Sequence, residues 1–384
     1  MTDFAAIRSQ FPILDQEIHG HPLVYLDSAA TSQKPQCVID AESDFYRTIN
    51  AGVHRGAHEL AARSTMAFED ARAKVAKLVG ADSAEGEEEI VVTKAEHHSV
   101  LLPFQELALR TGATLKWFDL DEEGRVRSDT ADEVITDRTK IVAVTHVGNT
   151  TGAITDTAPI IRRAHEVGAV FVLDACQSVP HLKVDFHALD VDFAAWSAHK
   201  MYGPTGVGFL YGKREMLEAL PPANFGGSMV ELAWMDQEAQ YMEPPARFEA
   251  GTQPVAQVVA AGVAAEWLMN IGMENLEAHE RTITDELLKM GDIDGIRILG
   301  PRSNKERIGT VAFEVEGVHP HDVGQFIDAQ GIAIRVGHHC AQPVHRHFGV
   351  YASNRASGGI YNSVEDAQAL IEALGKVRPF FGVE

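Results

Sequence analysis

Residues 140–174 decide the fold, because they contain KIVAVTHV (140–147), then APIIRRAHEVG (158–168), and finally AVFVLD (169–174). The first and last runs are continuously apolar and rich in β-branched residues, so each predicts a strand that is buried on both faces. Between them, residues 157–166 carry apolar residues at helical spacing, and this pattern stops at Gly168. Strands that alternate with helices in this way indicate a mostly parallel sheet with helices on both faces.

The same pattern extends in both directions from this unit. Further strand-like runs, bounded by turn residues, lie at 90–93, 114–118, 193–197 and 207–211, and a helix-like run lies at 99–110. The sequence therefore predicts an α/β fold whose large domain, residues 21–260, is built on a mostly parallel sheet.

The chain after about residue 260 has a different pattern. Helices are predicted at 255–269 and 273–290, followed by strands near 297–299 and 310–315, a helix at 320–330 and a strand at 333–336. Helices and strands that do not alternate regularly indicate an α+β arrangement. We therefore assign residues 261–384 to a smaller C-terminal domain, and residues 1–20 to an N-terminal arm that belongs to it.

Composition and charge limit the possible partners. The chain has 384 residues, and its 33 basic and 55 acidic side chains give a net charge of −22. This balance argues against nucleic acid or an anionic membrane as the main partner. The three cysteines, Cys37, Cys176 and Cys340, are too few and too widely spaced for a disulfide framework or a zinc site. We see no signal-peptide pattern and no apolar run of about 18 residues, so we expect a cytoplasmic, reducing setting.

A lysine after a predicted strand is the first candidate for chemistry. Residues 197–206 read SAHKMYGPTG, so Lys200 lies between an apolar strand and a turn rich in glycine and proline. Open α/β sheets bind ligands at this edge, and Ser197 and His199 could bond an anion beside the amine. Most isolated lysines in such turns are surface residues, but a lysine placed here can form a Schiff base with an aldehyde cofactor.

Polar residues also follow two other predicted strands. Asp174 ends its strand, where a carboxylate is costly unless it has a partner. It is either a structural cap or ion pair, or the group that keeps a pyridinium nitrogen protonated, and Gln177 could reach the same ring. His97 and His98 follow another strand without a cluster of metal ligands beside them. An imidazole stacked on an aromatic cofactor is the sharper hypothesis for this pair.

A third group of polar residues lies nearer the C-terminus. Residues 335–343 read RVGHHCAQP, which places Cys340 beside two histidines in a loop bounded by glycine and proline. Nearby cations favour the thiolate and exposure permits attack, whereas we interpret Cys37 and Cys176 as buried, inert cysteines. Arg355 could hold a carboxylate through two parallel hydrogen bonds.

Together these motifs resemble the SUF-type cysteine desulfurases, which are enzymes of the class V aminotransferase superfamily that depend on pyridoxal 5′-phosphate (PLP). The resemblance covers nearly the whole chain, and the combination of motifs is specific although each motif alone is weak. The motifs that carry it are YLDSAAT (25–31), VHRG (53–56), EHHS (96–99), THVGN (145–149), DACQ (174–177), SAHKMYGPTG (197–206), FEAGT (248–252), RVGHHCAQP (335–343) and RAS (355–357). The form RxGHHCA indicates the SUF type.

The resemblance implies the fold type I architecture of PLP enzymes, with a mostly parallel sheet of the seven-stranded type, and a role for each matching residue. Lys200 links to PLP covalently and later moves protons at the substrate α-carbon. His97 stacks on the cofactor ring and takes part in catalysis, Asp174 pairs with the ring nitrogen, and Gln177 bonds the ring hydroxyl. The cofactor phosphate is bound by Ser197 and His199, together with Thr252 of the other subunit.

The resemblance also assigns the substrate contacts. Asn149, which also contacts the cofactor, and Arg355 hold the substrate carboxylate, and His54 and Arg335 complete the substrate site. Cys340 attacks the substrate sulfur and becomes a persulfide, which leaves L-alanine. A site completed across subunits requires a homodimer.

One departure from the resemblance lies between Gly80 and Ile90. In the family a strand leads into a Gly-Thr-Thr-Glu-Ala-like turn that opens a helix, and the N-terminus of this helix binds the cofactor phosphate. Here residues 81–89 read ADSAEGEEE, and a strand and a helix, roughly 25 residues, are missing. Either the protein lacks its main phosphate site or this sequence omits a segment. The second is favoured, because losing a buried strand and helix should cost more than a marginal stability of roughly 5–15 kcal/mol.

We therefore predict a dimeric, PLP-dependent cysteine desulfurase that uses L-cysteine and passes persulfide sulfur to a SUF-system acceptor protein for iron–sulfur cluster assembly. We expect no metal site. One alternative is a selenocysteine lyase or another class V lyase, against which Cys340 argues. The other is a PLP-poor, non-catalytic scaffold for assembly proteins. The missing turn supports the scaffold, whereas the retained Lys200, Asp174 and Arg355 argue against it.

Overall fold

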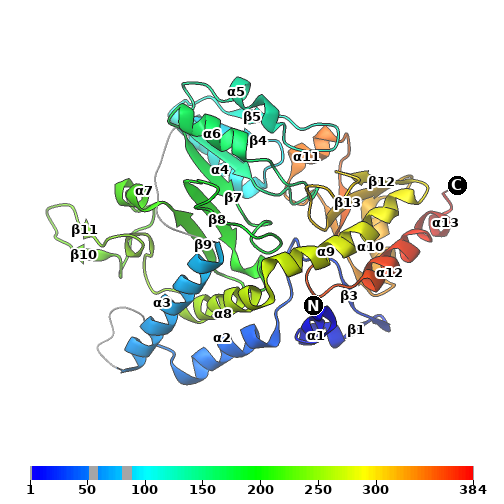
Figure 1. Ribbon diagram of the computed structural model, residues 1–384, viewed down its shortest axis with the longest axis horizontal. Helices are drawn as coiled ribbons and strands as arrows, with labels where there is room; N and C mark the ends of the chain where they lie inside the picture. The colour runs from blue at the N-terminus through cyan, green and yellow to red at the C-terminus, as the bar shows by residue number, and fades with distance from the viewer. Residues whose placement is uncertain (1, 52–58, 80–88, 384) are drawn as a thin grey trace.

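The central sheet of this computed structural model, which describes residues 2–51, 59–79 and 89–383, confirms the predicted α/β fold (Figure 1). Its strands lie in the order β5 (Lys116–Phe118), β4 (Ile90–Thr93), β6 (Ile141–Thr145), β7 (Val170–Asp174), β8 (Phe193–Ser197) and β9 (Gly208–Gly212). The strands from β5 to β8 run parallel. β9 is antiparallel to β8, because residues 198–207 between them are too short for a crossover helix.

Helices cover both faces of this sheet, which explains why its strands are apolar throughout. Val142 and Val144 of β6 lie in the same core cluster as residues of α6 (Ala158–Glu166). Ala143, between them, lies in a different cluster with residues of α4 (His98–Thr111). Neighbouring residues of a strand point to opposite faces, so α4 and α6 lie on opposite sides of the sheet.

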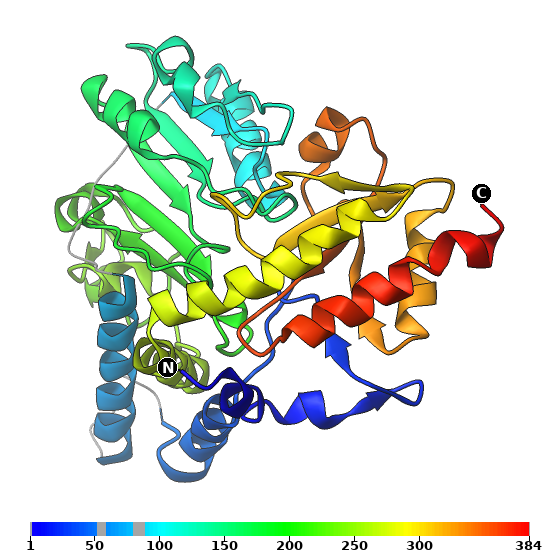
Figure 2. The same ribbon diagram turned by 45° about the vertical axis from the view of Figure 1, so that its right-hand side comes forward.

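A second, antiparallel sheet forms a smaller lobe, as the α+β pattern after residue 260 predicted. Its strands lie in the order β12 (Ile296–Leu299), β13 (Thr310–Val315), β16 (Ser353–Ser357) and β15 (Arg335–Gly337). Its core includes residues of α9 (Met273–Leu288), α10 (Pro320–Asp328) and α12 (Val364–Leu374). Figure 2 shows α9 and α12 side by side on this lobe. We did not predict β16, because its sequence SNRAS is polar although all five residues are buried.

The N-terminal segment packs against both lobes. Ile7, Phe11 and Leu14 lie in the core of the central sheet. In contrast, β3 (Val24–Tyr25) pairs in parallel with β14 (Ile332–Ala333) of the smaller lobe. The division into residues 1–20, 21–260 and 261–384 therefore stays a prediction.

Helix α8 (Val255–Ile271) packs against α2 (Gln36–Thr48) and α3 (Glu59–Val79), and this burial explains its apolar sequence. A β-carbon on Gly262 would lie 2.5 Å from the β-carbon of Ala71 in α3, so the two helices touch closely there. No single helix in the described part of the chain is long and apolar enough to cross a membrane. The pair α8 and α9 reaches that length only together, across a bend of 79°.

The remaining elements are short. They are α1 (Phe4–Arg8), η1 (Pro12–Asp15), β1 (Glu17–Ile18), β2 (His21–Pro22), η2 (Ser128–Thr130), α5 (Ala131–Val134), η3 (Ala198–Lys200), α7 (Arg214–Ala219), β10 (Val230–Leu232), β11 (Gln240–Tyr241), η4 (Ala246–Phe248), η5 (Lys289–Asp292), α11 (Gln342–His347) and α13 (Val377–Phe381).

Candidate active site

The carboxyl ends of the parallel strands open into a cavity of about 600 Å³, part of it open to solvent. Asp174 ends β7 and Ser197 ends β8, while His97 and Asn149 follow β4 and β6. The predicted site residues that line this cavity are His97, Asn149, Asp174, Ser197, His199, Lys200, Arg335, Cys340 and Arg355. The structure therefore brings together most of the residues that the motifs singled out.

The turn that carries Lys200 is fixed by the segment that follows β3. The hydroxyl of Ser32 donates to the carbonyl of His199 (2.9 Å) and accepts from the amide of Tyr202 (3.0 Å). The ammonium of Lys34 donates to the same carbonyl (2.9 Å), and burial lowers the pKa of Lys34 to about 8. Lys200 therefore enters the cavity from a backbone that is held on both sides of it.

Two carboxyl groups lie at the strand ends beside the cavity. Asp174 lines it, and its Oδ1 accepts from the amide of Cys176 (2.9 Å). Glu96 is fully buried, and its Oε1 accepts from the hydroxyl of Thr93 (2.7 Å) and the amide of Thr145 (2.8 Å). Burial raises the pKa of Glu96 to about 8, so this side chain is mostly protonated at neutral pH and joins the ends of β4 and β6.

Helix α4 begins at the cavity wall with two histidines that have different contacts. The Nδ1 of His97, the N-cap residue, accepts from the amide of Ser99 (3.1 Å). Burial, followed by the charge of Lys200, lowers the pKa of His97, so its ring is neutral at pH 7. The amide of His98 instead donates to the carbonyl of Cys340 (2.8 Å), and so connects this helix to the cysteine loop.

The loop that carries Cys340 has an uncommon backbone conformation. His339 and Cys340 have φ values of +49° and +56°, in the left-handed region that residues with a side chain rarely adopt. The Nδ2 of Asn149 donates to the carbonyl of His339 (2.6 Å). Together with the bond from His98, this contact anchors the loop to the lobe of the central sheet.

The other two cysteines differ from the interpretation made from sequence. Cys37 is exposed on α2, so its interpretation as a buried residue is wrong; its neighbour Val38 occupies the buried face of that helix instead. Cys176 is partly buried, but it lies in the cavity wall that contains Cys340. Burial raises the pKa of Cys176 to about 12, so its thiol stays protonated at neutral pH.

Arg355 reaches the cavity from β16, and only 1% of it is exposed. Its Nη1 donates to the carbonyl of Asn149 (2.9 Å), and its Nη2 pairs with Asp27 (3.2 Å). Burial lowers the pKa of Arg355 to about 10, so it stays charged at neutral pH. We assigned no role to Asp27 from sequence. The sequence did contain one signal for Asp27, because it is a carboxylate that closely follows a short strand, as Asp174 is a carboxylate at the end of a strand.

Three predicted site residues are not in this wall. The side chain of Gln177 is buried nearby, where its Nε2 donates to the carbonyl of Ala29 (3.1 Å) and its Oε1 has no partner in the described structure. Thr252 does not line the cavity of its own chain. His54 lies outside the described residues, as do residues 80–88. Within the described ranges, no group of three His, Cys, Asp or Glu residues could hold a metal ion.

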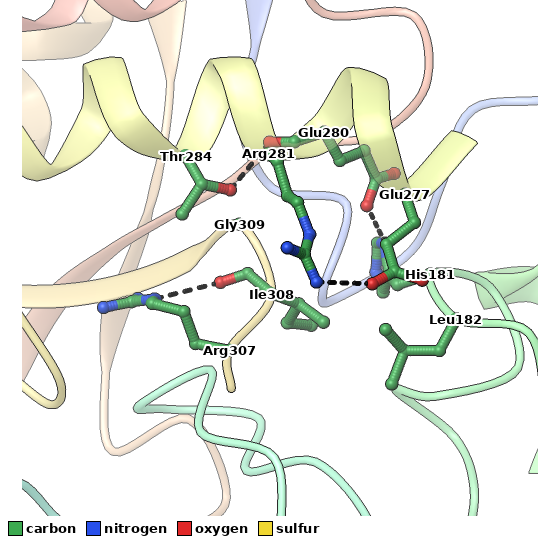
Figure 3. Close-up of a pocket in the computed structure, with 9 residues that line it drawn as sticks. All are labelled: His181, Leu182, Glu277, Glu280, Arg281, Thr284, Arg307, Ile308 and Gly309. Atoms are coloured by element: carbon green, nitrogen blue, oxygen red, sulfur yellow. Dashed lines mark hydrogen bonds and ion pairs between the residues drawn. The ribbon is translucent and has the colours of Figure 1, made fainter. Parts of the chain in front are cut away.

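A second, much smaller hollow, of about 200 Å³ when the space open to solvent is included, lies beside α9 (Figure 3). Its polar side chains pair with one another: His181 with Glu280 (2.8 Å), and Arg281 with Glu277 (2.8 Å). Glu280 also accepts from the hydroxyl of Tyr202 (3.5 Å). These contacts connect α9 to the turn that carries the candidate lysine, and we assign this cavity no ligand.

Known proteins match this chain over almost its full length. The profile of the family described as Aminotransferase class-V matches residues 24–86 and 84–370. A probable cysteine desulfurase of Streptomyces coelicolor is 45% identical over 413 residues, which cover 100% of this chain and 99% of that protein. The apo structure of a cysteine desulfurase from Thermococcus onnurineus NA1 has a TM-score of 0.92 and 33% identity, and covers 99% of both chains. The Escherichia coli cysteine desulfurase CsdA has a TM-score of 0.89 and 34% identity, with the same coverage.

The Streptomyces relative also contains positions that this chain lacks. Its alignment spans 413 positions, of which this chain fills 384, so at least 29 positions have no counterpart here. The two segments of the family profile meet at residues 84–86, which lie between Gly80 and Ile90. This number of positions is close to the length of the strand and helix that are missing from the family motif between Gly80 and Ile90.

Proposed function

We propose, because this chain belongs to the class-V aminotransferase family, that it is a PLP-dependent cysteine desulfurase, which transfers the sulfur of L-cysteine to Cys340 and releases L-alanine. The observation that carries this function is that Lys200 and Cys340, which come from different lobes, line one cavity together with Arg355. The similarity to proteins named cysteine desulfurase, over whole chains, supports it.

The chemistry of the cavity wall fits PLP. Lys200 supplies an amine for the covalent link, Asp174 supplies a carboxylate for the ring nitrogen, and His97 supplies a neutral imidazole for the ring face. The buried Oε1 of Gln177 lacks a partner among the described residues and is an acceptor for the ring hydroxyl. The groups left for the phosphate are Ser197 and His199, with Thr252 of the partner subunit. When bound, the cofactor withdraws electrons from the substrate α-carbon.

The substrate carboxylate is held by Arg355 and Asn149, with Arg335 and His54 as further contacts. The ion pair of Arg355 with Asp27 and its bond to a backbone carbonyl fix the direction of the guanidinium before substrate arrives. A group that is already oriented loses little freedom on binding. The amine of Lys200 moves a proton at the substrate α-carbon, while Arg355 keeps the substrate in register.

Sulfur transfer then proceeds by attack of the Cys340 sulfur on the substrate sulfur. The bond between the substrate β-carbon and its sulfur breaks, and a sulfur–sulfur bond forms on Cys340. The β-carbon takes a proton and leaves as the methyl group of L-alanine. Cysteine and a thiol thus give alanine and a persulfide, so the atoms balance and the step needs no external oxidant.

We further propose a cytoplasmic homodimer that delivers persulfide sulfur to a SUF-system acceptor protein for iron–sulfur cluster assembly. Thr252 is absent from its own cavity wall, which supports a role in the partner subunit. Phe225, Leu232 and Met235 are 69%, 50% and 103% exposed around the β10–β11 hairpin, and apolar surface of this kind favours association. The short loop around Cys340 gives little reach, so turnover should be slow until the cognate acceptor is added.

The test of the function compares Cys340→Ser with Cys176→Ser, because both thiols line the cavity. Cys340→Ser should keep the visible absorbance of bound PLP but form no persulfide and no alanine from L-cysteine. Cys176→Ser should retain both products. The opposite pattern would overturn the assignment. A preference for selenocysteine over cysteine would favour a selenocysteine lyase, and absent PLP absorbance in the purified protein would favour a scaffold.

A further inference from the structure

The left-handed backbone at Cys340 is held on one side by the lobe of the central sheet. The contacts are the bonds from Asn149 and His98, and the bond from the amide of Gln342 to the Nε2 of His98 (3.1 Å). Two consecutive residues with side chains, His339 and Cys340, have positive φ values. Such a conformation persists only where the surroundings hold it. Support on the other side comes from three side chains that are almost completely buried: His339 is 3% exposed, His345 1% and Ser353 0%.

These three side chains form one hydrogen-bonded chain. The Nε2 of His339 lies 3.0 Å from the hydroxyl of Ser353, and the Nε2 of His345 lies 3.0 Å from the same hydroxyl. The Nδ1 of His345 lies 3.1 Å from the carbonyl oxygen of Ala341. The chain therefore begins at the residue before Cys340 and ends at the backbone of the residue after it.

The direction of each hydrogen bond follows from the groups involved. A carbonyl oxygen only accepts, so the Nδ1 of His345 carries the proton that it donates to Ala341. Burial lowers the pKa of His345, so its ring is neutral and its Nε2 accepts the single hydroxyl proton of Ser353. The oxygen of Ser353 is then free to accept from the Nε2 of His339, whose pKa burial lowers to about 2.

We propose that Ser353 and His345 are positioning residues for Cys340, which hold its sulfur toward the substrate through this directed chain of hydrogen bonds. Neither residue lines the cavity, so both act through His339 and the backbone of Ala341. This positioning role rests on the proposed role of Cys340 as the sulfur acceptor. It extends the site by two residues that carry no chemistry of their own.

Removal of the Ser353 hydroxyl would take one hydrogen bond from each of two buried, neutral imidazoles. An unpaired buried polar group is costly, and the loop can relieve this cost by leaving its left-handed conformation. The sulfur of Cys340 would then spend less time near the substrate sulfur. The sulfur of Cys340 would also be more accessible to small reagents in solution. The rate of persulfide formation should therefore fall, while the rate of alkylation of Cys340 should rise.

The test measures both effects in the PLP-bound protein. Alkylation by iodoacetamide is followed separately at Cys37, Cys176 and Cys340 by mass spectrometry, and persulfide formation is followed with L-cysteine. Ser353→Ala should raise the alkylation rate of Cys340 alone by roughly threefold or more. It should also slow persulfide formation by about tenfold, which corresponds to about 1.4 kcal/mol.

Three further variants define the comparison. Ser353→Thr keeps a hydroxyl and should restore slow alkylation and fast persulfide formation. His345→Phe removes both hydrogen bonds of that ring and should behave as Ser353→Ala does. Ser64→Ala is the matched control, because it removes another buried hydroxyl, which donates to the carbonyl of Ala51 (2.8 Å) far from the loop in sequence. It should change neither rate.

Each result has a defined meaning. Unchanged rates at Cys340 in both Ser353→Ala and His345→Phe would overturn the positioning role. Faster alkylation at all three cysteines would indicate general loosening and would overturn it as well. If the alkylation of Cys340 responds as expected but persulfide forms on another residue, the positioning role stands and the proposed sulfur acceptor is wrong.

Discussion

Lys200 is the residue on which the cofactor assignment depends. Its turn is held by Ser32 and Lys34 rather than by its own side chain, so Lys200→Ala should fold normally. We expect this variant to form no alanine from L-cysteine. Reduction of the wild-type protein with borohydride should fix the cofactor to Lys200, as peptide mapping can establish. A reduced adduct on any other lysine would contradict the assignment.

Glu96 should make the stability of the folded protein depend on pH. Burial raises its pKa from the ordinary value of 4.5 to about 8. Between these values the folded protein keeps a proton that the unfolded chain has released, so the stabilisation present at low pH is lost as pH rises through this range. The loss has a limiting slope of about 1.4 kcal/mol per pH unit.

The measurement compares Glu96→Gln with the wild type by chemical unfolding from pH 5 to pH 8. The amide cannot ionise, and it keeps an oxygen for the amide of Thr145. We expect the wild type to lose stability relative to Glu96→Gln as pH rises. Parallel pH profiles for the two proteins would show that Glu96 is already ionised in the folded state.

At the scale of elements, the contact between α8 and α3 depends on the absence of a side chain. A β-carbon on Gly262 would meet the β-carbon of Ala71 at 2.5 Å and its α-carbon at 2.6 Å. Gly262→Leu should therefore separate two packed helices and destabilise the protein by about 2–3 kcal/mol, as overpacked cores are destabilised. Gly227→Leu is the control, because nothing lies within 4 Å of its β-carbon position. Urea unfolding that ranks the two variants equally would contradict this account of the contact.

Elements with a regular hydrophobic pattern could be predicted from sequence, and elements held by distant polar contacts could not. The strand predicted at 169–174 is β7, Val170–Asp174, because a continuous apolar run needs no partner to be recognised. β16 reads SNRAS, and pairing with β13 and β15 is what makes it a strand. The antiparallel direction of β9 follows from the short connection at residues 198–207, whose length the sequence already shows but which we did not use to predict the direction.

The same distinction applies to the candidate site. Lys200 and Cys340 could be found because their local sequences combine a strand end or a glycine-bounded loop with reactive side chains. Ser353 could not be found, because its partners His339 and His345 meet it only after β15 and β16 pair. Asp27 is likewise identified by its ion pair with Arg355, which is far away in the sequence.

At the scale of the whole molecule, the edge of the central sheet points to the same missing segment as the sequence does. β9 is the last strand of the sheet, and its outer edge has no strand partner in the described residues. Leu210 of β9 is 59% exposed. The unpaired amides and carbonyls of an open sheet edge are a liability that proteins normally cover. A further strand beside β9 would pair with them, and a helix packed on the face that carries Leu210 would cover its side chain.

We therefore expect the natural protein to be longer than the sequence described here. At least 29 alignment positions of the Streptomyces relative have no counterpart in this chain, and a segment of that size holds a strand, a turn and a helix. The N-terminus of such a helix would supply the amides and the dipole that bind a phosphate, whereas Ser197 and His199 supply only part of such a site.

Intact mass spectrometry of the protein isolated from its source should give about 3 kDa more than 41.8 kDa, and this protein should retain PLP through purification. A chain of 41.8 kDa that loses PLP easily would show that the phosphate site is truly absent. The same mass with tightly held PLP would show that another part of the chain binds the phosphate.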